Sequence, residues 1–245
     1  MTTSKNTSNR IVEFSTLESK CAYLPQKRAR MQYKYISNCS SVLNSQLVKR
    51  GWRRFGEYFS RPQCMNCQEC LNLRIDAQNF EFSRNDRRTL KKNTNTKVII
   101  RQPSITAEHL NLYNKYHKIM EEKKGWKHYN LSMQSYYELY IAGHGEFGKE
   151  ILYFIDNKLV GVDLVDVVED GLSSIYCFYD PDYDKFSLGR YSLYQQILLT
   201  LHHNMRWVYL GYYVKDCPSL SYKANYKPYE ILQGFPELEE IAYWE

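Results

Sequence analysis

The sequence lacks several features that would assign it to a familiar class at once. Its apolar stretches, such as residues 159–162 and 197–201, are far shorter than the roughly 20 residues needed to cross a bilayer. Residues 1–10 are polar and have no apolar segment of the kind found in a secretory signal. The six histidines include no HExxH spacing, and no Ser/His/Asp order or paired-carboxylate pattern stands out. These absences predict a cytoplasmic protein with no membrane partner.

The composition that is present is that of an ordinary globular protein with a basic balance. Hydrophobic residues make up 43% and charged residues 24%, which excludes disorder as the main state. The formal net charge of +6 is consistent with a polyanionic partner. The seven cysteines are an odd number in a chain without an export signal. A reducing compartment is therefore favoured, where closely spaced cysteines indicate metal binding or chemistry rather than disulfides.

The two halves of the chain differ in pattern. Residues 1–101 hold five of the seven cysteines and the densest basic segments, whereas regular periodicity begins near residue 103. No internal repeat is present. We therefore expect a Cys-rich, basic N-terminal domain at residues 1–102 and a second domain at residues 103–245.

The second half predicts a fold of the α+β class. Apolar spacing predicts helices over residues 107–124 and 131–142, then strands at 151–155, 158–168 and 172–179. A helix that Ser187 can cap and a strand at 207–213 follow. Short turns make the three strands antiparallel neighbours, and the last strand can return in parallel through a crossover. This order matches an acetyltransferase-like (GNAT-type) mixed sheet flanked by helices, whose strands separate where the parallel neighbour joins.

A cluster of cysteines indicates a metal site in the first half. Cys64, Cys67 and Cys70 are three residues apart, and thiolates at this spacing suit zinc or an iron–sulfur cluster. Cys21 is the natural fourth ligand. The alternative is a loop of packed thiols without metal.

Two basic segments favour a nucleic-acid partner. Cations that can neutralise phosphates gather in residues 84–92, namely Arg84, Arg87, Arg88, Lys91 and Lys92. In residues 49–56, Trp52 and Phe55 lie between cations and could stack on exposed bases. The alternative for the first segment is a solvated surface helix.

A possible anion site opens the helix that follows the meander. The residues there are Ser187, Leu188, Gly189 and Arg190, and free N–H groups at a helix start bind anions. An ordinary helix cap is the alternative. The segment lacks the several glycines of a coenzyme A pyrophosphate loop, which argues against a CoA-dependent acetyltransferase.

Tyrosines and one lysine lie where the strands are predicted to separate. Tyr209, Gly211 and Tyr212 belong to the last strand, and Tyr222 and Lys223 follow it. A phenol and a cation can position or polarise an ester carbonyl. The alternative is simple packing, because the chain has 23 tyrosines.

Together these segments resemble a known family, the aminoacyl-tRNA–protein transferases, and most closely its short bacterial aspartate/glutamate leucyltransferases. The resemblance rests on blocks in the right order across residues 20–235: Cys21-Ala22-Tyr23-Leu24-Pro25; Gly51-Trp52-Arg53-Arg54; Arg61-Pro62-Gln63-Cys64; Arg74; Ser83-Arg84; Gly171-Leu172-Ser173-Ser174-Ile175-Tyr176; Phe178-Tyr179-Asp180-Pro181; Ser187-Leu188-Gly189-Arg190-Tyr191; Tyr209-Leu210-Gly211-Tyr212; and Tyr222-Lys223-Ala224. It implies a catalytic second domain that transfers an amino acid from its tRNA to the N-terminal amine of proteins beginning with Asp or Glu. The product would be a degradation signal.

The sequence departs from the family pattern in places. Residues 120–124 replace a usual Arg-His pair, Ser221 replaces a usual Met, and Asp163 stands at a usually small, apolar position. These changes affect the expected donor and pocket geometry more than the reaction type. Leucine is the expected donor, and arginine is the alternative. A metal-dependent RNA-binding module is a further, non-enzymatic alternative.

The reaction itself assigns roles to several residues. An acidic acceptor side chain calls for a cation, and Arg74, Arg88 and Lys223 are the candidates. The 187–190 segment would meet the terminal adenosine or its phosphates, and residues 84–92 would follow the acceptor stem. Asp166 could act near the amine, or it could be a surface residue beside a turn. The chemistry itself requires no cofactor, because an α-amine with a pKa of about 8 is partly neutral at cellular pH.

Overall fold

The chain folds around a mixed sheet of seven strands, described by a computed structural model for residues 10–127 and 129–245. The strand order is β13-β7-β12-β11-β10-β9-β8. The strands are β7 (Leu71–Asp76), β8 (Lys97–Arg101), β9 (Gly148–Ile155), β10 (Lys158–Val168), β11 (Gly171–Tyr179), β12 (Trp207–Tyr213) and β13 (Tyr229–Ile231). β11 and β12 run parallel, and the other neighbouring pairs in this sheet are antiparallel. Of the polar segment at residues 1–10, all but Arg10 lies outside the described residues.

The predicted meander of β9, β10 and β11 is confirmed. Asp156 and Asn157 join β9 to β10 with φ angles of +50° and +60°, the conformation of a tight hairpin turn. β10 pairs with β9 on one side and with β11 on the other, so its side chains are buried on both faces. A run rich in Val and Leu suits such a central position.

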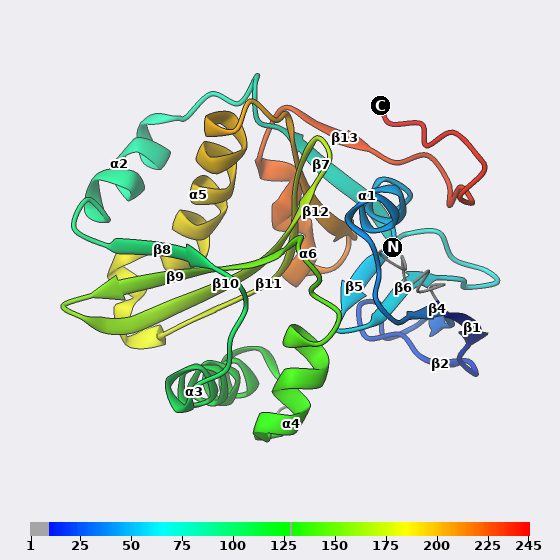
Figure 1. The fold of residues 1–245 in the computed structure, drawn as a ribbon, viewed down its shortest axis with the longest axis horizontal. Coiled ribbons are helices and arrows are strands. Elements are labelled where there is room, and N and C mark those ends of the chain that lie inside the picture. Colours follow the sequence, from blue (N-terminus) through cyan, green and yellow to red (C-terminus); the bar gives the residue numbers. More distant parts are fainter. Residues whose placement is uncertain (1–9, 128) are drawn as a thin grey trace, which may run out of the picture.

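Helices cover both faces of this sheet (Figure 1). α2 (Arg84–Lys92) and α5 (Leu188–His202) lie on one face, and α3 (Ala107–Lys124) and α4 (Met133–Tyr136) lie on the other. α4 continues into the π-helical turn η1 (Tyr137–Ile141). Alternating residues of β9 serve the two layers: Leu152 packs in the α3 core, and Ile151 packs beneath α5.

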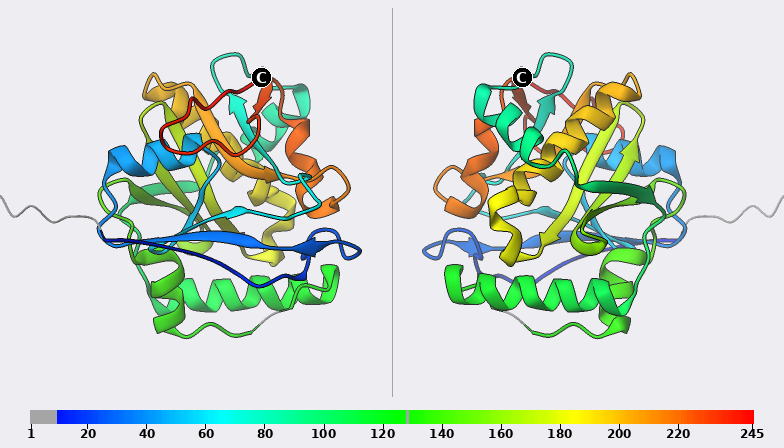
Figure 2. Two further views of the ribbon diagram at one scale, coloured as in Figure 1. Left: turned by 90° about the vertical axis from the view of Figure 1, so that its right-hand side faces the viewer. Right: turned by 90° about the vertical axis from the view of Figure 1, so that its left-hand side faces the viewer.

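A second, smaller sheet of four strands packs at one end of the first (Figures 1 and 2). Its order is β1-β4-β6-β5. The remaining elements are β1 (Ile11–Ser15), β2 (Ser19–Lys20), β3 (Arg28–Ala29), β4 (Met31–Ile36), α1 (Ser41–Lys49), β5 (Arg53–Phe55), β6 (Tyr58–Pro62), η2 (Pro181–Phe186), α6 (Pro218–Ser221) and η3 (Tyr222–Asn225). Ile36 and Phe59 face inward, and Tyr33 and Tyr58 alternate to the opposite face.

The domain boundary predicted at residues 102/103 runs through the large sheet. β7 pairs with β12 and β13, and β8 pairs with β9, although both β7 and β8 precede that boundary. Residues 71–101 therefore belong to the same sheet as the second half. Local periodicity could not show this, because the partners of β7 lie more than 130 positions further along the chain.

Among the helices that the structure describes, none combines the length and the apolar character that crossing a membrane requires.

Candidate active site

The two parallel strands separate near the middle of the sheet, as the sequence predicts. β11 and β12 pair only over Gly171–Ser173 and Trp207–Tyr209, although both strands continue well beyond. A bulge interrupts β12 between Tyr209 and Gly211, where Gly211 has a φ of +68°. Bulges bend a strand and change the direction of its carbonyls. The gap therefore contains backbone oxygens that lack a strand partner.

Two cations fill this gap. Lys223 Nζ donates to the carbonyls of Leu210 and Tyr212 at 2.8 and 2.7 Å. Arg53 extends from β5 and donates to Leu210 O at 3.3 Å and, across the gap, to Ile175 O at 3.0 Å. Both side chains therefore meet at Leu210 O, and only Arg53 also contacts β11.

A groove of about 1820 Å³ opens beside these cations. Ser187, Gly189 and Arg190 line it at the start of α5, and Tyr222 and Lys223 line it beside the gap. Two sequence segments more than 30 positions apart thus face one space. One cleft therefore links the start of α5 to the residues that follow β12.

The start of α5 presents free N–H groups to the groove. Ser187 has the left-handed φ of +54°, and its side chain makes no capping bond, contrary to the expected cap. Ser187 N–H donates to Asp184 O, and Arg190 N–H donates to Ser187 O. Within the described residues, the N–H groups of Leu188 and Gly189 have no acceptor, so these two are available to an anion. Gly189 fits closely here, since a Cβ at this position would lie 3.0 Å from the ring of Tyr179.

Burial changes the protonation behaviour of the gap residues. Lys223 is 6% exposed, and burial followed by the positive charge of Arg53 lowers its pKa well below the ordinary value. Tyr222 is 48% exposed, and the partial desolvation of its hydroxyl raises its pKa to about 12. Tyr222 is therefore a neutral phenol at cellular pH that can donate a hydrogen bond into the groove.

Asp166 does not lie in the groove. Its carboxylate is fully buried, and the guanidinium of Arg54 holds both of its oxygens at 2.7 Å. The prediction that Asp166 is a surface residue beside a turn is therefore wrong. Its buried position also gives no support to a role at the substrate amine.

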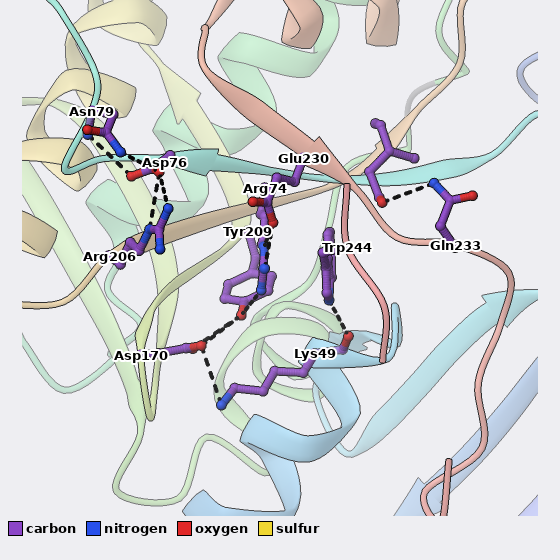
Figure 3. Close-up of polar contacts among 11 residues, drawn as sticks. Lys49, Arg74, Asp76, Asn79, Asp170, Arg206, Tyr209, Glu230, Gln233 and Trp244 are labelled. Atoms are coloured by element: carbon purple, nitrogen blue, oxygen red, sulfur yellow. Dashed lines mark hydrogen bonds and ion pairs between the residues drawn. The ribbon is translucent and has the colours of Figure 1, made fainter. Parts of the chain in front are cut away.

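Arg74 and Tyr209 belong to a separate cluster behind the gap (Figure 3). Arg74 forms two hydrogen bonds to Glu230 Oε2, at 3.0 and 2.6 Å, and lies 3.7 Å from the ring centre of Trp207. Tyr209 accepts a bond from Arg74 and donates to Asp170. Because Glu230 already neutralises Arg74 outside the groove, the predicted contact of Arg74 with an acceptor carboxylate does not fit this arrangement. Tyr209 and Gly211 line a cavity of about 10 Å³ distinct from the groove.

The basic side chains of α2 lie beside the groove rather than inside it. Ser83 and Asp86 form a capping box at the start of α2, and both line the groove. The basic set stands on the outer part of the helix, where most of its members are exposed: Arg84, Arg87, Arg88, Lys91 and Lys92. Arg88 is thus placed for a surface contact rather than for an acceptor residue held in the groove.

The four predicted metal ligands are neighbours without a ligating arrangement. Cys21, Cys67 and Cys70 pack around Leu24 with other apolar groups, and Cys64 Sγ lies 3.7 Å from Arg30 O. Burial, followed by the neighbouring Cys21, raises the pKa of Cys70 to about 12. Within the described residues, no group of three His, Cys, Asp or Glu side chains is arranged to hold a metal ion. Zinc or an iron–sulfur cluster here stays a prediction.

Arg53 is the functional candidate that the site assignment from sequence missed. Its side chain lines the groove, and it also lines the small cavity beside Tyr209 and Gly211. The signal was its place in the block Gly51-Trp52-Arg53-Arg54, where strand alternation sends Arg53 and Arg54 to opposite faces. Nothing local in the sequence showed that one of these faces is a groove.

The fold and the site define a class: a mixed α+β protein whose central sheet separates beside a large groove that Arg53 and Lys223 line. The family model for the C terminus of arginine-tRNA-protein transferase matches residues 108–233, and the model for the N terminus matches residues 19–88. The chain belongs to the arginine-tRNA-protein transferase family.

Several relatives are similar over nearly the whole chain. An aspartate/glutamate leucyltransferase of Campylobacter jejuni is 57% identical over 96% of this chain and 98% of its own length. A leucyltransferase of the same name from Helicobacter hepaticus is 39% identical over the same shares of both chains. One from Pseudomonas putida is 32% identical over 91% of this chain and 94% of its own.

Solved structures resemble the chain more distantly. FemX has a TM-score of 0.45 at 9% identity, covering 84% of this chain and 80% of FemX. The L-PGS protein from Bacillus licheniformis has a TM-score of 0.43 at 12% identity, covering 59% of this chain and 45% of its own.

Proposed function

We propose that this protein transfers leucine from leucyl-tRNA to the N-terminal amine of proteins that begin with Asp or Glu. The relatives that cover almost the whole chain are named for this activity. The observation that carries the proposal is the single groove that joins the start of α5 to Tyr222 and Lys223 at the separated strands.

The reaction is the aminolysis of an ester. The neutral α-amine of the acceptor attacks the leucyl carbonyl carbon, a peptide bond forms, and the bond from that carbon to the ribose oxygen breaks. The amine loses a proton, and the ribose hydroxyl gains one. Holding ester and amine together in one groove supplies most of the needed rate, because the second-order step becomes effectively unimolecular.

The leucyl-tRNA end belongs on the α5 side of the groove. The N–H groups of Leu188 and Gly189 suit the phosphates of the terminal nucleotides, and Arg190 adds a cation. Outside the groove, the cations of α2 continue the positive surface toward the acceptor stem. In this proposal the sheet is of the acetyltransferase type, with the tRNA end in the place of coenzyme A.

Tyr222 and Lys223 belong to the reaction centre. The Tyr222 phenol can donate to the ester carbonyl, where negative charge develops in the transition state. Lys223 uses two of its hydrogens on Leu210 O and Tyr212 O, so its remaining hydrogen or lone pair is available to the groove. In the cell, the modified proteins would carry a degradation signal, and the site of action would be the cytoplasm.

The test offers the protein leucyl-tRNA or arginyl-tRNA together with peptides that begin with Asp, Glu, Lys or Ala. Mass spectrometry of the products should find leucine added to the Asp and Glu peptides alone. Transfer onto Lys or Ala peptides, or no transfer from leucyl-tRNA, would contradict the proposal. Arginine addition would instead favour the activity for which the family is named. Acetyl-CoA in place of tRNA should yield no product.

A further inference from the structure

The two cations at the strand gap have no negative partner. Arg53 and Lys223 both donate to Leu210 O, and each of their remaining hydrogen bonds goes to a main-chain carbonyl. Within residues 10–127 and 129–245, neither forms an ion pair. A positive charge on the buried Lys223 beside the half-buried Arg53 is costly to hold without an anion, and this cost is the reason that the pKa of Lys223 is lowered. A bound anion would remove this cost.

We infer that Arg53 is the residue that reads the acidic side chain of the acceptor, with Lys223 as the second cation of the same anion site. This inference rests on the proposed function and adds the residue that sets its specificity. Three of the five N–H donors of Arg53 go to the carbonyls of Leu210, Ser174 and Ile175, which leaves two donors for a ligand. Its side chain is half-buried and lines the groove, so an acceptor can reach it.

The position of Arg53 points to the acceptor rather than to the tRNA. The small sheet also lines the groove and carries a row across its strands, in the order Phe14, Tyr33, Ser60 and Arg53. The rings of Phe14 and Tyr33 are stacked, and Tyr33, Ser60 and Arg53 line the groove. A peptide lying along this row would bring its first side chain to Arg53. Its α-amine would then face the α5 side, where the leucyl ester lies.

The backbone is shaped to admit this arginine. Gly211 sits at the β12 bulge, and a Cβ there would lie 2.1 Å from Arg53 Nη1. Any other residue would displace the guanidinium. The other candidate cations are less suitable, because Glu230 neutralises Arg74 and Arg88 stands outside the groove.

The experiment compares acidic peptides with their neutral isosteres at saturating leucyl-tRNA. Peptides that begin with Asp or Asn, and with Glu or Gln, differ in charge alone. In the wild type, kcat/KM should favour Asp over Asn strongly. Arg53→Met should lower kcat/KM for the Asp peptide by at least about 30-fold and leave that for the Asn peptide within about threefold, so the preference disappears.

Controls separate a specificity role from a structural one. Arg50→Met is the matched control, because Arg50 also bonds main-chain carbonyls, here of Glu237 and Glu240, but lies outside the groove. Its Asp/Asn ratio should equal that of the wild type. Arg53→Gln keeps N–H donors for the strand carbonyls without the charge, so it serves if Arg53→Met does not fold. It should lose the preference and keep the thermal midpoint.

Two outcomes would overturn the inference. An Asp/Asn ratio in Arg53→Gln equal to the wild-type ratio would show that another group reads the charge. An equal fall in kcat for both peptides would place Arg53 at the ester oxyanion instead. Either result leaves the proposed function intact, whereas a wild type that transfers no leucine would contradict that function itself.

Discussion

Arg53 and Arg54 are neighbours on one short strand, yet their charges meet opposite surroundings. Arg54 is 3% exposed, and Asp166 neutralises it through two bonds of 2.7 Å. Arg53 points to the other face, toward the groove, and its hydrogen bonds within the described residues go to main-chain carbonyls. The charge of Arg54 is neutralised within the protein, whereas the charge of Arg53 is neutralised only when an anion binds. The comparison separates cations that support the fold from cations that await a substrate.

The largest effect is expected from breaking the ion pair between Arg54 and Asp166. Arg54→Met leaves the Asp166 carboxylate buried without a partner, and such losses cost about 3–5 kcal/mol. Thermal or urea unfolding should show this loss. Arg54→Met combined with Asp166→Leu should recover much of the stability, because no charge is then left buried. A double variant no more stable than the single one would show that the ion pair itself is needed.

The second-largest effect is expected from a substitution at Gly211, a backbone position that contacts Arg53. Gly211→Ala places a methyl group against the Arg53 guanidinium and should lower kcat/KM for an Asp peptide about tenfold or more. Gly234→Ala is the matched control, because Gly234 has a similar φ of +69° with nothing within 4 Å of its added Cβ. Both variants carry the same backbone strain. Equal losses of activity in the two would remove the link between Gly211 and Arg53.

A third test asks whether Arg74 is neutralised within the protein, like Arg54, or by a bound anion, like Arg53. Arg74→Met removes the ion pair with Glu230 and the stacking on Trp207, so unfolding should become easier by about 2 kcal/mol. The ratio of kcat/KM for Asp and Asn peptides should stay at the wild-type value. Loss of the preference for Asp over Asn would indicate that Arg74 belongs to the acceptor site.

The smallest effect is a pH dependence that Lys223 should give to the acceptor preference. The lysine carries its charge below its pKa, and burial lowers that pKa, so the second cation is lost at a lower pH than it would be for an ordinary lysine. The Asp/Asn ratio should therefore fall severalfold as the pH rises. Comparing the two peptides cancels most of the titration of their α-amines. Lys223→Arg should give a ratio that does not change with pH, and a flat wild-type profile would contradict the role of Lys223.

The sequence predicts the elements of the second half closely. The helix at residues 107–124 and the strands at 158–168 and 207–213 have the predicted bounds. Their apolar spacing, turn residues and caps are local signals, so no knowledge of the fold is needed to find them. The parallel return of β12 also follows, because a helix-long connection makes a crossover natural.

Contacts between distant segments are not available from the sequence pattern. Asp166 lies in a strand buried on both faces, so alternation does not reveal its environment, and its partner Arg54 is 112 positions away. The pairing of β7 with β12 is equally distant and places Arg74 behind the sheet. For the same reason Arg53 was seen only as part of a basic segment, although its partners Ile175 and Leu210 create the gap.

The most direct test of the account is a crystal structure with both substrates in place. A leucyl-tRNA end in which an amide replaces the reactive ester, together with a peptide that begins with Asp, would hold the site before reaction. We expect the leucyl carbonyl between Ser187–Arg190 and Lys223, and the aspartate carboxylate on Arg53. Either ligand bound outside this groove would contradict the claim that the separated strands bring the two substrates together.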